Sequence, residues 1–91
     1  MNMATTRLQI QNIKGLHARA SAKMVEVVES HDATAVVSKD GMRAGGDSIM
    51  GLLMLAATKG TWIEVETHGP AADDLKDAIA ALVDDKFGEG D

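Results

Sequence analysis

The apolar residues of this 91-residue chain change their spacing several times along its length. Residues 5–12 alternate between apolar and polar side chains, which is typical of a half-buried strand. Residues 17–30 change to helical spacing, which predicts an amphipathic helix. Its core-facing stripe is expected to comprise Ala18, Ala22, Val25 and Val28, with Ser21 and Met24 beside it. A chain that switches between these two periods is expected to combine strands with helices.

The remaining residues predict three more strands and two more helices. Asp40-Gly41 favours a hairpin turn between two of the strands. Ser48 is expected to cap the middle helix, and Lys59-Gly60 to end it. Pro70 suits the first turn of the last helix, which has Leu75, Ile79, Leu82 and Val83 on its buried stripe. The predicted strands cover residues 33–39, 42–45 and 61–68, and the predicted helices cover 48–58 and 70–87.

The elements therefore follow one another in the order βαββαβα, before a short polar tail at residues 88–91. Four strands with interleaved helices predict one sheet with one face covered by helices, an α+β sandwich. A chain of this length supports one hydrophobic core, so we expect a single domain over residues 1–91. Because Trp62 and Phe87 are the only aromatic residues, aliphatic side chains and methionine must fill that core.

Composition excludes several classes of function. The net charge of −5, from nine basic and fourteen acidic residues, provides no positive field for binding nucleic acid. The absence of cysteine excludes disulfides and thiolate metal sites, and it fits a reducing compartment. The first residues lack the basic and apolar regions of a signal peptide, and no long apolar run predicts membrane insertion. We therefore expect a cytoplasmic protein.

A histidine, His17, stands at the predicted start of the first helix, within GLHARASAK. A helix start offers free N–H groups and about half a positive charge, which attracts anions and favours a neutral, nucleophilic imidazole. If that ring attacked phosphorus, the phosphoryl oxygens would lie near the amides of Ala18 and Arg19 and near the Arg19 guanidinium. Because phosphoryl transfer depends mainly on positioning and charge neutralisation, no metal or cofactor is required of the chain. The alternative is a solvated helix cap without chemistry.

Two other chemistries have less support in the sequence. His17, His31 and His68 stand in three separate segments, and none has a second histidine or a cysteine three to five residues away, so a zinc site is not expected. The chain also lacks the G-x-S-x-G motif of serine hydrolases.

Ser48 and the apolar residues after it form a second candidate site. The hydroxyl of Ser48 is expected to accept a hydrogen bond as a helix cap. Ile49, Met50 and Leu53 follow in a helix too short to bury every apolar side chain, so part of it is expected to be exposed. An exposed patch of aliphatic residues and methionine predicts a surface for several partners. The alternative is a short helix sunk into a small core.

The stretch GLHARASA, followed by GGDSIMGLLMLAATKGTWIEVETHG, resembles the HPr family, the histidine-containing phosphocarrier proteins of the bacterial phosphoenolpyruvate-dependent phosphotransferase system. The similarity extends from about Thr5 to Phe87. It implies an open-faced β-sandwich in which three helices cover one face of a four-stranded antiparallel sheet. It also implies a phosphoryl carrier rather than a self-sufficient enzyme.

The same resemblance implies a role for each candidate residue. His17 would accept a phosphoryl group on Nδ1 from phospho-enzyme I and pass it to an enzyme IIA protein, while Arg19 would neutralise the phosphoryl charge. Ser48 matches the serine that an HPr kinase/phosphorylase modifies in some bacteria. A carrier that presents one face to several partners is expected to be a monomer. The family's hydrophobic docking patch corresponds to Ile49, Met50 and Leu53.

One position departs from the family pattern. The family usually continues G-L-H-A-R with proline, and this chain has Ala20 there instead. Alanine loosens the helix start but adds an N–H, so the amides of Ala18, Arg19 and Ala20 are the expected phosphate donors. The sugar and nitrogen branches of the system both stay open. A further alternative is a regulatory protein-binding module that is controlled by phosphorylation at Ser48 or His17.

Overall fold

The strands of the computed structural model, which describes residues 2–89, lie side by side in one sheet. The sheet order is β1-β4-β2-β3, and every neighbouring pair is antiparallel. On the central strand β4, Ile63 lies opposite Leu8 of β1, and Val65 lies opposite Val37 of β2. The predicted antiparallel sheet is therefore confirmed. Its strands are β1 (Met3–Gln9), β2 (Thr34–Lys39), β3 (Met42–Gly45) and β4 (Trp62–His68).

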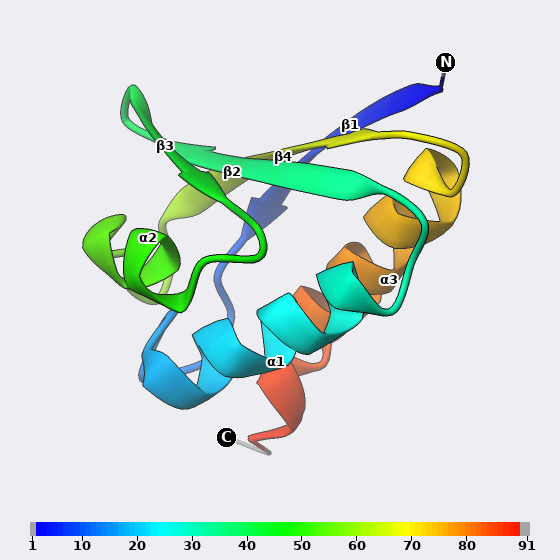
Figure 1. Cartoon of the computed structure of the whole chain (residues 1–91). Helices are drawn as coiled ribbons and strands as arrows, with labels where there is room; N and C mark the ends of the chain where they lie inside the picture. Colours follow the sequence, from blue (N-terminus) through cyan, green and yellow to red (C-terminus); the bar gives the residue numbers. More distant parts are fainter. Residues whose placement is uncertain (1, 90–91) are drawn as a thin grey trace.

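The helices cover one face of this sheet and leave the other face open (Figure 1). This arrangement confirms the predicted α+β sandwich and the order βαββαβα. Within residues 2–89, no helix combines the length and the apolar character that a membrane crossing needs. The helices are α1 (Ala18–Glu29), α2 (Ile49–Met54) and α3 (Ala72–Asp84), followed by the short 3-10 helix η1 (Lys86–Gly88).

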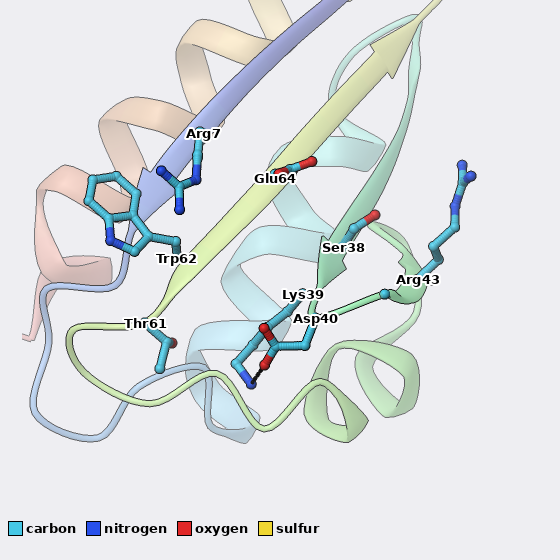
Figure 2. A pocket seen from close by; sticks show the side chains of 9 residues that line it. Arg7, Ser38, Lys39, Asp40, Arg43, Thr61, Trp62 and Glu64 are labelled. Atoms are coloured by element: carbon cyan, nitrogen blue, oxygen red, sulfur yellow. Dashed lines mark hydrogen bonds and ion pairs between the residues drawn. The ribbon is translucent and has the colours of Figure 1, made fainter.

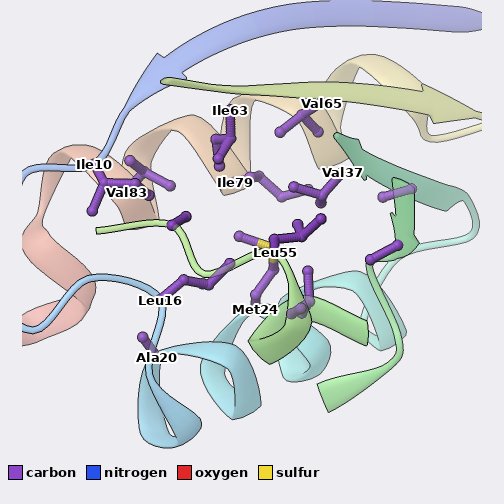
Figure 3. Close-up of a cluster of buried hydrophobic side chains, with 14 of the residues drawn as sticks. Ile10, Leu16, Ala20, Met24, Val37, Leu55, Ile63, Val65, Ile79 and Val83 are labelled. Carbon is purple, nitrogen blue, oxygen red and sulfur yellow. The ribbon is translucent and has the colours of Figure 1, made fainter. Parts of the chain in front are cut away.

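The core fills the space between the sheet and the helices, and Figure 3 shows its aliphatic side chains pointing inward from both layers. Ile63 and Val65 of β4 meet Met24 of α1 and Ile79 of α3 there, all fully buried or nearly so. Burial of each such side chain stabilises the fold by roughly 1.5–3 kcal/mol. The core is aliphatic as expected, except that it also contains Phe87, which is fully buried.

The buried face of α1 is rotated from the predicted stripe. Ala18 is exposed, and Ala22 and Val25 are only partly buried. Ser21 belongs to the core because its hydroxyl donates to the carbonyl of Leu16, 3.3 Å away, which satisfies a polar group that would otherwise favour solvent. The residues that α1 buries are Ala20, Ser21, Met24 and Val28.

Helix α2 ends at Met54 instead of residue 58. Ala56 has a φ of 52°, which turns the chain so that its neighbours Leu55 and Ala57 are both buried. The carbonyl of Ala57 then accepts a hydrogen bond from the Leu16 N–H at 2.8 Å. The burial of Leu55 and Ala57, together with this long-range hydrogen bond, stabilises the fold more than four further helical residues would. The predicted stop at Gly60 belongs instead to the turn before β4.

Helix α3 is shorter than predicted at both ends. It begins at Ala72, so Pro70 lies in the preceding turn, and it ends at Asp84. Beyond it, Phe87 adopts a φ of 54° and places its ring in the core, which a continuous helix to residue 87 would not allow. The predicted buried stripe is confirmed at Leu75, Ile79 and Val83, and Leu82 is partly buried.

Ser48 caps α2 as predicted, because its hydroxyl oxygen accepts a hydrogen bond from the Gly51 N–H at 3.0 Å. We expect Ser48→Ala to lower the free energy of unfolding by about 1 kcal/mol, since the amide loses its acceptor. Urea denaturation measures this loss. Ser38→Ala is the control, because Ser38 is also half-buried and its hydroxyl makes no hydrogen bond within residues 2–89. Equal stability of the two variants would contradict a capping role.

Candidate active site

His17 is the N-cap residue of α1, which confirms the predicted helix start. Its backbone is extended, with φ −78° and ψ −177°, and its carbonyl accepts the Ser21 N–H at 2.8 Å. The imidazole makes no capping hydrogen bond, so it does not compete with an anion for the amides of the first turn. The ring is therefore available at a helix start, with 27 % of the side chain exposed.

A cavity of about 610 Å³ surrounds His17. Among the described residues that line it are three cationic side chains, Lys14, Arg19 and Lys23, and a single carboxylate, Glu89. This excess of positive charge stands out in a chain whose net charge is −5, and it favours an anionic ligand beside the histidine. The full lining is Ile13, Lys14, His17, Ala18, Arg19, Lys23, Gly88 and Glu89.

The predicted phosphate-binding residues are not equally placed. Arg19 is exposed, and within residues 2–89 its guanidinium forms no ion pair, so it can turn toward an anion. Ala18 is exposed and lines the cavity beside Arg19. Ala20 belongs to the same helical turn, but its side chain is fully buried and it does not line the cavity.

Backbone contacts fix the loop that carries His17. The N–H of Leu16 donates to the carbonyl of Ala57, and Gly15 has a φ of 65°. The side chain of Asn12 is completely buried, and its Nδ2 donates to the Gly15 carbonyl at 2.7 Å. Sequence reasoning missed Asn12, because an asparagine near a glycine indicates only a turn.

The tail after α3 returns to this loop. The carboxylate of Glu89 contacts Nε2 of His17 through Oε2, and its Oε1 accepts a hydrogen bond from Asn12 Nδ2 at 2.9 Å. Lys23 holds the same segment by donating to the carbonyl of Phe87 at 2.5 Å. Figure 1 shows this segment running past α1. Residues 88–91 were expected to be a polar tail, and no local pattern links Glu89 to a histidine 72 residues away. Residues 90 and 91 lie outside the described part of the chain.

The apolar patch predicted on α2 is partly exposed, as expected. Met50 is 68 % exposed and Ile49 40 %, while Leu53 is half-buried. Two apolar residues outside the predicted patch are exposed as well, namely Met54 at 67 % and Ile13 at 66 %. Ile13 lines the His17 cavity, and α2 packs against α1. The exposed apolar surface therefore includes one residue at the rim of that cavity.

Three other cavities contain none of the predicted site residues among the described residues that line them. On the open face of the sheet, the guanidinium of Arg7 lies over the Trp62 ring, 4.5 Å from its centroid, and Lys39 pairs with Asp40 (Figure 2). His31 and His68 line a separate cavity. His31 follows the C-terminal end of α1 and His68 is the last residue of β4, whereas His17 precedes the first residue of α1. Among residues 2–89, no three potential ligands are grouped to hold a metal ion.

Known proteins are similar to this chain in sequence and in fold. A family model described as "PTS HPr component phosphorylation site" matches residues 4–85. The phosphocarrier protein HPr of Neisseria meningitidis serogroup A is 43 % identical over 89 residues, which cover 98 % of this chain and all of the relative. The phosphocarrier protein NPr of Escherichia coli K12 is 37 % identical over 83 residues, covering 90 % of this chain and 92 % of the relative.

Solved structures agree with the sequence matches. The crystal structure of a phosphocarrier protein HPr from Bacillus anthracis has a TM-score of 0.86 and 34 % identity to this chain. The match covers 91 % of this chain and 99 % of that structure. The chain therefore belongs to the HPr family of phosphocarrier proteins of the phosphotransferase system.

Proposed function

We propose that this chain accepts a phosphoryl group on His17 from phospho-enzyme I and passes it to an enzyme IIA protein. The observation that carries the proposal is the partly exposed imidazole at the start of α1, beside the cations Lys14, Arg19 and Lys23. A phosphoryl group carries about two negative charges at neutral pH, so the three cations around His17 favour its binding there.

The transfer needs only a nucleophile and charge neutralisation. The Nδ1 lone pair of His17 attacks phosphorus, and the P–N bond of the donor breaks with its electron pair returning to the donor ring. The Arg19 guanidinium and the first-turn amides of Ala18, Arg19 and Ala20 hold the phosphoryl oxygens. In the onward step, an enzyme IIA nucleophile attacks the same phosphorus and the electron pair returns to Nδ1.

The apolar patch Ile49, Met50 and Leu53 supports docking of the donor and the acceptor in turn. Because both partners would use this one face, we propose that the carrier works as a monomer, in the cytoplasm. We also propose Ser48 as a regulatory site for an HPr kinase/phosphorylase. A phosphate on that residue, immediately before Ile49, would add negative charge beside the patch and weaken docking.

The proposed function is tested with labelled phosphoenolpyruvate and purified enzyme I. We expect one label per chain, stable in base and lost in acid, because a phosphohistidine is cleaved when its ring is protonated. Adding an enzyme IIA from the sugar branch or from the nitrogen branch should then remove the labelled phosphoryl group from the chain. The enzyme IIA that accepts it faster identifies the branch. Failure to take up label, or an acid-stable label, would contradict the proposal.

A further inference from the structure

Helix α2 carries two exposed methionines, Met50 and Met54, that are four residues apart. Residues at this spacing are neighbours on one face of a helix, so both thioethers lie on the same side of α2. The apolar patch of Ile49, Met50 and Leu53 belongs to the same helix. We propose that Met50 and Met54 are sites of reversible oxidation, and that a sulfoxide on these residues weakens the docking of enzyme I on the apolar patch.

Thioethers are the sulfur groups of this chain that an oxidant can attack. The chain contains six methionines and no cysteine, so no thiolate reacts in their place. Met24 is fully buried in the core, which shields its sulfur from a dissolved oxidant. Two of the exposed methionines are on α2, while one lies at the start of β1 and one on β3. The exposed methionines among residues 2–89 are Met3, Met42, Met50 and Met54.

Hydrogen peroxide is the oxidant that this modification requires. A lone pair of the thioether sulfur attacks one peroxide oxygen, so that an S–O bond forms and the O–O bond breaks. The other oxygen leaves as water after proton transfer. Sulfur loses two electrons in this step, and the peroxide gains them. A methionine sulfoxide reductase reverses the change, because its thiols supply two electrons and the sulfoxide oxygen leaves as water.

The sulfoxide changes the chemistry of the apolar patch. A methionine side chain is flexible and apolar, and it packs against partner surfaces of different shapes. The added oxygen accepts hydrogen bonds from water, and a docked partner would remove that water. Because burial of an unpaired polar group is unfavourable, we expect the affinity for enzyme I to fall roughly ten- to hundredfold. This inference rests on the proposed function, in which the patch docks enzyme I.

Oxidation on α2 leaves the candidate active site chemically unchanged. Neither Met50 nor Met54 is among the described residues that line the His17 cavity, so the imidazole and the cations there are not altered. Helix α2 packs against α1, so a partner on the apolar patch lies beside the helix that follows His17. The modification should therefore raise the KM of enzyme I for this chain, which depends on docking, and leave kcat unchanged.

The experiment compares the full chain before and after treatment with hydrogen peroxide. Peptide mass spectrometry locates the added oxygen, which we expect on Met50 and Met54 and not on buried Met24. Labelling by phosphoenolpyruvate and enzyme I is then measured over a range of chain concentrations. We expect KM to rise roughly ten- to hundredfold at an unchanged kcat. Treatment with a methionine sulfoxide reductase and a dithiol should restore the original KM.

Three variants assign the effect to α2. The double variant Met50→Leu/Met54→Leu replaces both thioethers with side chains of similar volume, so peroxide should not change its KM from whatever value the untreated variant has. Met50→Gln/Met54→Gln places polar groups there without an oxidant, so its KM should be raised before any treatment. Met3→Leu is the matched control, because Met3 is also exposed but lies far from α2 (Figure 1), and it should respond to peroxide as the native chain does.

The outcomes distinguish this inference from the proposed function. If enzyme I does not label the untreated chain, the proposed function fails. Mapping of the sulfoxides still tests the sites, since oxidation of Met3 without oxidation of Met50 and Met54 would overturn them. A native KM in a chain that carries both sulfoxides would overturn the effect on docking, even with His17 fully active. A loss that the reductase does not reverse, or that Met3→Leu abolishes, would overturn it as well.

Discussion

Replacing His17 with alanine is expected to lower acid-labile labelling by phosphoenolpyruvate and enzyme I by about a thousandfold or more. The reason is that no second histidine, and so no second imidazole nucleophile, lies among the described residues that line this cavity. The variant should fold, because the His17 side chain is partly exposed and makes no capping hydrogen bond. Far-UV circular dichroism checks folding, and the label is measured on the purified chain.

The other two histidines provide matched controls for this loss. His31 and His68 line a cavity away from His17 and face neither Arg19 nor Lys23 there. We expect His31→Ala and His68→Ala to keep native labelling. An unchanged acid-labile signal in His17→Ala, or its loss in His68→Ala with the fold intact, would move the acceptor elsewhere and overturn the assignment.

The features that the sequence predicts correctly depend on nearby residues. Alternating strands, the hairpin after Lys39, and the caps at His17 and Ser48 each follow from spacing or from one local hydrogen bond. The position of His17 belongs to this group, because the helix start is visible within a nine-residue stretch.

The features that the sequence does not predict depend on contacts between distant segments. Helix α2 ends early because Leu55 and Ala57 are buried and Ala57 pairs with Leu16. Glu89 reaches the site because Phe87 enters the core, which a helical pattern running to residue 87 conceals. Lys23 also holds the tail, because its amine donates a hydrogen bond to the carbonyl of Phe87. Such contacts join segments that are distant in the sequence, so they can be identified only in the folded structure, where the sheet and the helices pack together.

Gly15 shows how one of these distant contacts positions the candidate active site. Its φ of 65° is a conformation that residues with a side chain adopt at a cost. A Cβ atom at this position would overlap the carbonyl oxygen of Ala57 and lie 3.0 Å from Cα of Thr58. Both neighbours are backbone atoms, so they cannot move aside as a flexible side chain can. The loop therefore packs against the segment after α2 only if residue 15 is glycine.

Gly15→Ala is accordingly expected to lower the free energy of unfolding by about 3 kcal/mol, from about 1 kcal/mol of backbone strain and about 2 kcal/mol of steric overlap. Gly60→Ala isolates the first contribution, because Gly60 has a φ of 87° but open space around its Cβ position, and it should lose only about 1 kcal/mol. Urea denaturation of both variants measures the difference. Because displacement of the loop also moves His17 relative to Arg19, Gly15→Ala should accept phosphate more slowly at a temperature where it is folded. Equal losses of stability in the two variants would show that the loop yields around residue 15 and that the contact with Ala57 does not hold His17 in place.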